Sequence, residues 1–251
     1  MSINDSLASS PMTPPAMAPL EPLVFLLDVD NTLLDNDRFG ADLDARLEQS
    51  FGGVQRARYR AIYDRLRDEL GYADYLGALQ QLRTGLGDDP ALLQMSAFLL
   101  DYPFAERYFP HALDTVAYLR TLGPTAILSD GDVVFQPRKV QRSGLWDAVE
   151  GRVLISVHKE LMLSAVQRRF PAAHYVMIDD KPQVLARMKL AWGDTLTTVF
   201  VRQGHYAAES AQATIDPAPD RVVDGIGELR GADVGFFTLP THEAAIASAQ
   251  S

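Results

Sequence analysis

The sequence predicts an α/β protein with a doubly wound parallel sheet and an all-helical domain inserted after the first strand. Short apolar runs that end at a polar residue alternate along the chain with segments of helical periodicity. This alternation is typical of parallel strands that are covered by helices on both faces. Residues 36–109 interrupt the alternation, because they contain helical patterns and no convincing strand run.

The strands of the predicted sheet are five apolar runs. Four of them have apolar residues on both alternating faces, as expected of buried strands, and lie at residues 23–27, 125–128, 175–178 and 196–201. The fifth run, at residues 153–156, is shorter and predicts an edge or accessory strand. The first three runs stop directly before Asp28, Ser129 and Asp179.

Helices are expected between these strands, where apolar residues recur three and four positions apart. The segments with this spacing are residues 112–121, 159–169 and 182–189. Gly123 and Pro124 end the first of them, and Pro182 begins the third. Strands and helices in this order predict a Rossmann-like core formed by residues 23–35 and 110–235.

The inserted residues 36–109 are expected to form a helical cap domain over the carboxyl ends of the strands. Helical periodicity lies at residues 55–70, 72–83 and 91–100, with glycine-rich breaks at 52–53, 71 and 85–90. The first of these helices carries a set of arginines and tyrosines, namely Arg56, Arg58, Arg60, Arg65, Tyr59 and Tyr63. This set predicts a solvated stripe with the rings turned inward. The alternative is a face that grips part of a substrate.

Composition and charge exclude several classes of function. The 251 residues include 33 acidic and 23 basic side chains, a net charge of −10, which argues against nucleic acid as a partner. The absence of cysteine excludes thiol nucleophiles and cysteine-ligated zinc sites. No stretch approaches the roughly 18 consecutive apolar residues that span a bilayer, so no membrane partner is expected. The sequence carries no signal of oligomeric state.

The two ends of the chain are expected to form tails. Residues 1–22 are rich in Ser, Pro, Ala and Met, and they lack the basic start of a secretory signal. They predict a disordered N-terminal tail and, with it, a cytoplasmic protein. Residues 236–251 are expected to form a C-terminal tail.

An acidic motif follows the first predicted strand. It reads Asp28-Val29-Asp30-Asn31-Thr32-Leu33. The chain turns past a strand end, so both carboxylates can converge on one ligand, although Asp30 and Asn31 are also ordinary turn residues. Ligands of doubly wound sheets bind beyond the carboxyl ends of the strands. Asp28, Ser129 and Asp179 are all expected there, which makes that edge the candidate site.

Four motifs in order resemble the haloacid dehalogenase-like superfamily, in its phosphatase branch with a helical cap after the first motif. The first is Asp-x-Asp-x-Thr at residues 28–32, and the second is Ser129 at the end of a strand. The third is a lysine, best matched by Lys159, and the fourth is the acidic pair Asp179-Asp180. The likeness covers residues 23–180 and continues through the 198–201 strand to about residue 229.

The resemblance implies a role for each of these residues. Asp28 would be the nucleophile that forms an aspartyl-phosphate and would also bind Mg²⁺. Asp30 would protonate the leaving oxygen, then deprotonate the attacking water, and its backbone carbonyl would bind the metal. Ser129, Asp130 and Lys159 would bind the phosphoryl group, with Lys159 balancing its charge. Asp180 would be a metal ligand, and Asp179 would bind the metal directly or orient a metal-bound water.

Some residues depart from the family pattern or compete for a role. Val184 stands where many members have a further acid, which leaves the number of metal ligands open. Lys139 is a competitor of Lys159, but its place after the second motif predicts a surface or substrate-proximal residue. Arg138 and Arg142 are expected on a solvated helix face. His158 is expected to be a neighbour of the site rather than a base.

The function that these motifs imply is a Mg²⁺-dependent phosphatase that hydrolyses a small phosphorylated metabolite. Asp30 argues against a dehalogenase, because those members need no acid for the leaving group. A sugar phosphomutase of the same superfamily keeps both acids and is an alternative, as is a phosphate-binding member without catalysis. Receiver domains also form aspartyl-phosphates, but their acidic pair comes from the first strand, and they lack a cap.

Overall fold

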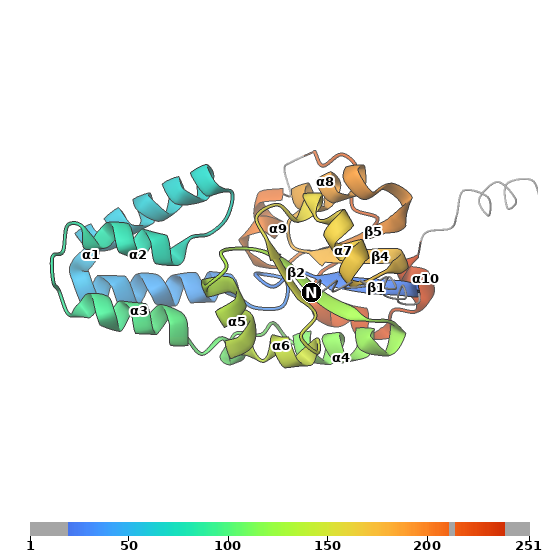
Figure 1. The fold of residues 1–251 in the computed structure, drawn as a ribbon, viewed down its shortest axis with the longest axis horizontal. Coiled ribbons are helices and arrows are strands. Elements are labelled where there is room, and N and C mark those ends of the chain that lie inside the picture. Colours follow the sequence, from blue (N-terminus) through green and yellow to red (C-terminus); the bar gives the residue numbers. More distant parts are fainter. Residues whose placement is uncertain (1–19, 211–213, 239–251) are drawn as a thin grey trace, which may run out of the picture.

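The sheet of this protein contains six strands, all parallel, in a computed structural model that describes residues 20–210 and 214–238. Its strand order is β3-β2-β1-β4-β5-β6. The strands are β1 (Glu21–Leu27), β2 (Thr125–Asp130), β3 (Val153–Ser156), β4 (Ala172–Asp179), β5 (Leu196–Val201) and β6 (Arg221–Val223). The α/β class and the helical insertion after the first strand are therefore confirmed (Figure 1).

The two edge strands compare differently with the prediction. The short run at 153–156 is β3, and it forms one edge of the sheet, as expected. The opposite edge, β6, was not predicted. It has only three residues, and Val222 is 47% exposed, so it lacks the apolar run that marks a buried strand.

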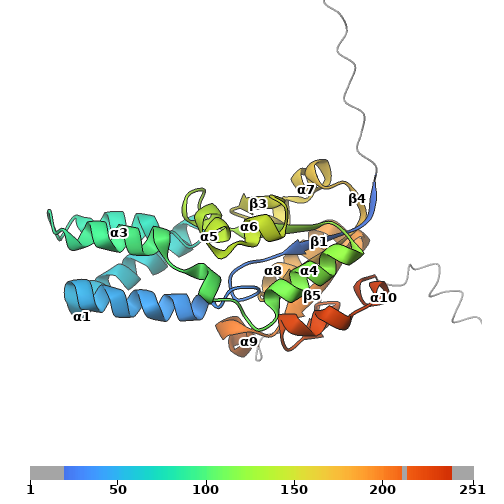
Figure 2. The same cartoon turned by 90° about the horizontal axis from the view of Figure 1, so that it is seen from below.

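Helices cover both faces of the sheet (Figures 1 and 2). One face packs against α4 (Ala112–Leu122), α6 (Leu145–Ala148) and the short helix η4 (Ile226–Gly231), and the other against α7 (Leu163–Arg169) and α8 (Pro182–Trp192). Successive side chains of a strand point to opposite faces. In β1, Leu23, Phe25 and Leu27 therefore join the first layer, and Val24 and Leu26 join the second.

The predicted helix over 159–169 is divided in the structure. A 3₁₀ turn, η2 (Lys159–Leu161), precedes α7, with Met162 between them. The helix predicted from Pro182 is α8 and runs three residues further, to Trp192. Other short elements of the core are α5 (Phe135–Ser143), η3 (Gly193–Thr195), α9 (Gly204–Ser210) and α10 (Val234–Phe237).

The cap consists of α1 (Asn36–Leu70), α2 (Tyr75–Arg83) and α3 (Ala91–Asp101), at one end of the molecule in Figure 1. Gly52 breaks α1 with a non-helical backbone (φ 80°, ψ 167°), where the sequence predicted a break. Arg60 Nε lies 2.6 Å from Asp44 Oδ1, so the two halves of α1 lie side by side. Tyr59 and Tyr63 are buried, as expected of rings that turn inward.

The cap and the core share one apolar cluster. The short helix η1 (Phe104–Glu106) follows the cap, and Phe104 packs against Phe39 of α1 (ring centroids 5.1 Å apart) and Phe135 of α5 (6.0 Å). The two chain segments between the domains also pair, since Phe109 N donates to Leu33 O at 3.0 Å. The cap therefore sits on the core at a fixed place near the end of β1.

The predicted limits of both tails need correction. β1 begins at Glu21, because Glu21 N donates to Pro171 O (3.0 Å) beside β4. At the other end Phe237, assigned to the C-terminal tail, is buried, and its ring lies 4.9 Å from that of Phe25. Residues 1–19 and 239–251 of the predicted tails lie outside the described residues. Within the described part of the chain, no helix is long and apolar enough to cross a membrane.

Candidate active site

Three carboxylates meet at the carboxyl edge of the sheet. Asp28 follows β1, Asp179 ends β4 and Asp180 comes next. β1 and β4 are neighbours, and Leu27 is in register with Ile178, so the residues after them must come together. One oxygen from each carboxylate lies within 4.8 Å of the others, and all three residues are buried. This arrangement can hold one metal ion.

The hydrogen bonding of these carboxylates is incomplete. Oδ2 of Asp28 and both oxygens of Asp180 are buried without a hydrogen-bond partner among the described residues. Burial, together with the adjacent Asp179 carboxylate, raises the pKa of Asp180 well above its ordinary value. Unpartnered buried carboxylates are costly, and oxygen-only donor sets are what Mg²⁺ prefers. The residues therefore fit a magnesium ion.

Lys159 lies against two members of this cluster. Its Nζ is 2.6 Å from Asp28 Oδ1 and 2.7 Å from Asp179 Oδ2. Burial would lower the pKa of Lys159, but Asp179 and Asp28 raise it well above its ordinary value, so the ammonium is charged. Burial would likewise raise the pKa of Asp28, but Lys159 and Lys181 hold it below the ordinary value. Asp28 is thus kept as an anion.

Asp130 positions Lys159 from β2. Its Oδ1 accepts hydrogen bonds from Lys159 N (3.0 Å) and from Ser156 Oγ (2.9 Å). Ser129, the preceding residue, donates from Oγ to Asp28 Oδ1 at 3.1 Å. The predicted Ser129, Asp130 and Lys159 therefore lie together beside Asp28.

Asp30 has a different environment from Asp28. Its carboxylate does not belong to the three-carboxylate cluster. Lys139 Nζ lies 2.6 Å from Asp30 Oδ1, and Gln136 Nε2 donates to Oδ2 at 3.2 Å. Asp30 lines a cavity between core and cap, so it still faces the space in which a substrate would bind.

Lys139 was expected to be a surface or substrate-proximal residue; the surface alternative is wrong, and its contact with Asp30 agrees with the second alternative. Lys139 is fully buried, whereas Arg138, on the other side of α5, is exposed and pairs with Asp101 of α3 (3.0 Å). A usable signal was the helical spacing of Phe135, Lys139 and Ser143, which puts all three on one buried face. The sequence also gave no reason to select Gln136, which contacts both Asp30 and Ser129.

The cavity has a volume of about 290 Å³. Its core side includes Asp30, Asp130 and Lys181, and its cap side includes Tyr63 and Tyr75. Its other cationic and aromatic lining residues are Arg67, Tyr72, His158, Arg187, His205 and Tyr206. His158 is therefore a neighbour of the site, as expected. The cavity offers a phosphorylated ligand both cations and aromatic surface.

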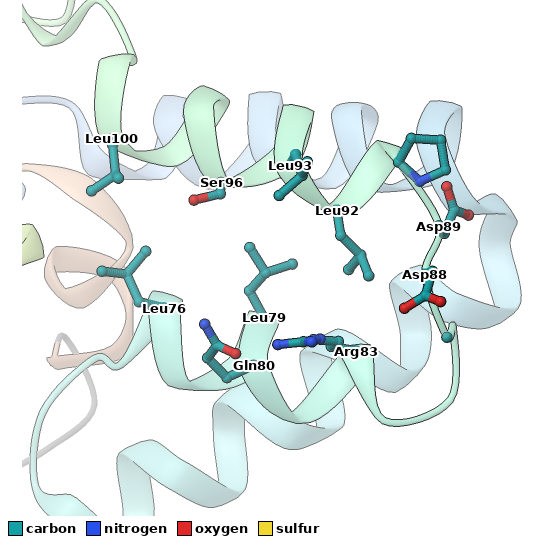
Figure 3. A pocket seen from close by; sticks show the side chains of 12 residues that line it. Leu76, Leu79, Gln80, Arg83, Asp88, Asp89, Leu92, Leu93, Ser96 and Leu100 are labelled. Carbon is teal, nitrogen blue, oxygen red and sulfur yellow. The ribbon is translucent and has the colours of Figure 1, made fainter.

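A larger cavity, of about 530 Å³, lies inside the cap (Figure 3). Leucines of α2 and α3 face one another across it, among them Leu76, Leu79, Leu92 and Leu100. None of the predicted site residues lines it. The smaller cavity at the edge of the sheet is therefore the candidate active site.

The loop that follows β1 is held from the β5 side. Gln203 Nε2 donates to Thr32 O at 3.1 Å, while its Oε1 accepts from Ile226 N at 2.7 Å. Asn31 adopts a left-handed conformation (φ 57°), which Asn tolerates better than most residues. Gly204 (φ 66°) lies so close that an added Cβ would come within 2.6 Å of Asn31 Cγ.

Gly204→Ala is therefore expected to destabilise the protein and to lower its activity. The new methyl group must displace Asn31 and with it the loop that carries Asp30, and alanine is strained at positive φ. We expect the free energy of unfolding to fall by about 1–3 kcal/mol, measured by denaturant titration. Gly231→Ala is the control, because a Cβ there meets no atom within 4 Å. Equal effects of the two substitutions would contradict this view of the loop.

Several solved protein structures are similar to this chain in sequence and in fold. It is 58% identical to a haloacid dehalogenase-like hydrolase from Burkholderia xenovorans, over 85% of this chain and 99% of that chain, with a TM-score of 0.80. The HAD-hydrolase YfnB from Bacillus subtilis, solved with bound magnesium, is 18% identical over 84% of this chain and 98% of that chain (TM-score 0.58).

A 2-haloacid dehalogenase from Pseudomonas syringae has the same fold. It is 19% identical over 84% of this chain and 97% of that chain, with a TM-score of 0.58. Neither a protein-family model nor a curated protein matches the chain. At such low identity, the last two structures support the fold and leave the reaction to be argued from the residues of the site.

Proposed function

We propose that this chain, which belongs to the haloacid dehalogenase-like hydrolases, is a Mg²⁺-dependent phosphatase that acts on a small phosphorylated metabolite. Asp30 carries the proposal, because its carboxylate lies two residues after Asp28 in the sequence and lines the cavity. An alkoxide leaving group needs a proton when its bond to phosphorus breaks. A halide leaves without one, so a dehalogenase has no use for this acid.

Asp28 and Asp180 are the proposed direct metal ligands, together with the backbone carbonyl of Asp30. Their unpartnered oxygens support this assignment. Asp179 has both oxygens engaged, by Lys159 Nζ (2.7 Å) and by Lys181 N (2.8 Å), which favours a role in orienting a metal-bound water. When bound, Mg²⁺ would neutralise phosphoryl charge and align the in-line displacement. The magnesium in YfnB supports the choice of ion.

The proposed reaction has two steps, both on this chain's own carboxylates. A carboxylate oxygen of Asp28 attacks phosphorus and forms an aspartyl-phosphate, while the ester bond breaks and Asp30 gives its proton to the leaving oxygen. Asp30 then takes a proton from water, which attacks phosphorus and releases phosphate with regeneration of Asp28. The ionised state of Asp28 suits the first step.

The proposed phosphoryl-binding groups are Ser129 Oγ, Lys159 Nζ and the backbone N–H of Asp130. Lys159 spans Asp28 and Asp179, so it can share its charge with an incoming phosphate. Oδ1 of Asp130 accepts from Ser156 Oγ and Lys159 N, and a carboxylate repels a phosphoryl group, so the backbone N–H is the group of Asp130 proposed to bind the ligand. Lys181 lines the cavity with an ammonium that lies 5.0 Å from the ring centroid of Tyr206.

An assay with paired substrates tests the proposal. With Mg²⁺ present, we expect phosphate release from an alkyl phosphate and no halide release from 2-chloropropionate. Asp30→Asn is expected to slow phosphate release by about 10²–10⁴-fold, since proton transfer is lost. Halide release without phosphate release would refute a phosphatase. Isomerisation of a sugar phosphate without free phosphate would instead identify a mutase.

A further inference from the structure

We propose that Lys139 and Gln136 are positioning residues that hold the carboxylate of Asp30 in its working orientation, an inference that rests on the proposed phosphatase function. Both come from α5, which no family motif covers. Lys139 Nζ lies 2.6 Å from Asp30 Oδ1, and Gln136 Nε2 lies 3.2 Å from Asp30 Oδ2. Each oxygen of the carboxylate therefore has its own donor, which fixes both its rotamer and its plane.

The hydrogen bonds of Gln136 connect Asp30 to the nucleophile. Gln136 Nε2 also donates to Ser129 Oγ at 3.1 Å, and Ser129 Oγ donates to Asp28 Oδ1 at 3.1 Å. Gln136, Ser129 and Asp28 are all buried. The relative placement of nucleophile and acid is thus set through a chain of three hydrogen bonds. Proton transfer in an enzyme depends steeply on such placement, and a small displacement costs much of the rate.

Lys139 is placed where the fold alone gives little reason for a charged residue. Its ammonium lies 5.3–5.8 Å from the centroids of four aromatic rings, those of Phe39, Tyr75, Phe104 and Phe135. A buried ammonium loses its hydration, and replacing a buried ion pair with apolar side chains is often neutral or stabilising. An apolar side chain would fill the space between these four rings as well. The need to hold Asp30 explains the lysine better than stability does.

The same lysine connects Asp30 to the cap. Lys139 Nζ donates to Asn36 Oδ1 at 3.0 Å, and Asn36 is the first residue of α1. Asn36 and Tyr75 both line the catalytic cavity, and their side chains are 3.5 Å apart. Three of the four rings around Lys139 also come from the cap helices or from η1. The orientation of Asp30 therefore depends on the cap being seated on the core.

Lys139→Met tests the role of the ammonium. Met keeps an unbranched apolar side chain between the four rings, and the Asp30 carboxylate, which loses its ionic partner, is 21% exposed and can be hydrated. We therefore expect the variant to fold, with an unfolding temperature below that of the wild type. The hydrolysis of an alkyl phosphate should fall by about 10²–10³-fold, because its leaving oxygen needs the proton of Asp30. 2,4-Dinitrophenyl phosphate has a leaving group that needs no proton. The rate of the pre-steady-state burst of dinitrophenolate should therefore stay within about threefold of the wild-type rate. The steady-state turnover of this substrate should still fall.

Matched variants separate positioning from a general disturbance. Arg142→Met removes a cation from the exposed side of the same helix, and it should leave both substrates unaffected. Asp30→Asn should reproduce the pattern of Lys139→Met, and the double variant should lose little more than Asp30→Asn alone, since the residues act as a unit. Gln136→Leu should also lower the hydrolysis of the alkyl phosphate and retain the burst with the dinitrophenyl ester. If Lys139→Met does not fold, this variant tests whether the donors to Asp30 position its carboxylate.

Two results would overturn the inference. If Lys139→Met lowered the burst rate with dinitrophenyl phosphate as much as it lowers the hydrolysis of the alkyl phosphate, Lys139 would only support the structure. Additive losses in the double variant would mean that it acts separately from Asp30. A wild-type protein that forms no phosphoenzyme and releases no phosphate would refute the phosphatase itself, and this outcome is distinct from a selective failure of the variants.

Discussion

Replacing Asp28 with Asn is expected to lower phosphate release by at least about 10⁴-fold, the scale seen when a catalytic nucleophile is removed. The amide cannot attack phosphorus as the carboxylate does, and it carries no charge to pair with Lys159, 2.6 Å away. The covalent step would be lost while the cavity keeps its shape. Substrate binding should therefore suffer far less than turnover.

Acid quenching provides a direct readout of the nucleophile. A labelled substrate should transfer its phosphoryl group to the wild-type chain in a form that hydroxylamine releases, as expected of an acyl phosphate. The Asp28→Asn variant should carry no label. Asp194→Asn serves as the control, because Asp194 lies on the surface far along the chain, in η3. An Asp28→Asn variant that kept most of its activity would rule out this nucleophile.

Removal of the metal should abolish activity, and Mg²⁺ should restore it. The cluster of Asp28, Asp179 and Asp180 binds the ion in our proposal, and Mg²⁺ should therefore raise the unfolding temperature of the wild type. Asp180→Asn should remove this thermal shift and lower turnover by about 10²–10⁴-fold. Full activity in the presence of excess chelator would exclude a role for the ion.

The same substitution should make the metal-free protein more stable. Burial and Asp179 raise the pKa of Asp180, so the folded state holds a proton that the unfolded state loses at lower pH. The carboxyl group therefore lowers the free energy of unfolding when the pH is above the ordinary pKa of an aspartate. It has no such effect when the pH is below that pKa. We expect Asp180→Asn to gain roughly 1–2 kcal/mol at neutral pH and little in strong acid. Denaturant titration in chelator at both pH values measures this difference.

A gain at neutral pH, combined with the loss of metal binding, would identify Asp180 as a residue kept for function at the expense of stability. A loss of stability in metal-free Asp180→Asn at neutral pH would instead mean that the carboxylate has a structural partner. Asp194→Asn again serves as the control and should shift neither quantity.

The class of the fold and the place of the candidate site could both be predicted from the sequence. Apolar runs identified five of the six strands, because strands buried on both faces consist mostly of apolar residues. Asp28, Ser129 and Asp179 each stood at the end of such a run. Parallel strands place their carboxyl ends at one edge, so these three residues had to meet there. Lys159 came from the order of the motifs, and the structure brings it to the same place.

The contacts that hold Asp30 could not be predicted, because they depend on tertiary packing. The place of Lys139 after the second motif predicted a surface or substrate-proximal residue, and the sequence could not choose between the two. The burial of Lys139 arises from Phe39, Tyr75 and Phe104, which are distant in the sequence and converge only when the cap packs on the core. Periodicity shows which side of a helix is buried, but the identity of the residues across from it is a property of packing. For the same reason the sequence could not describe the cavity between the two domains.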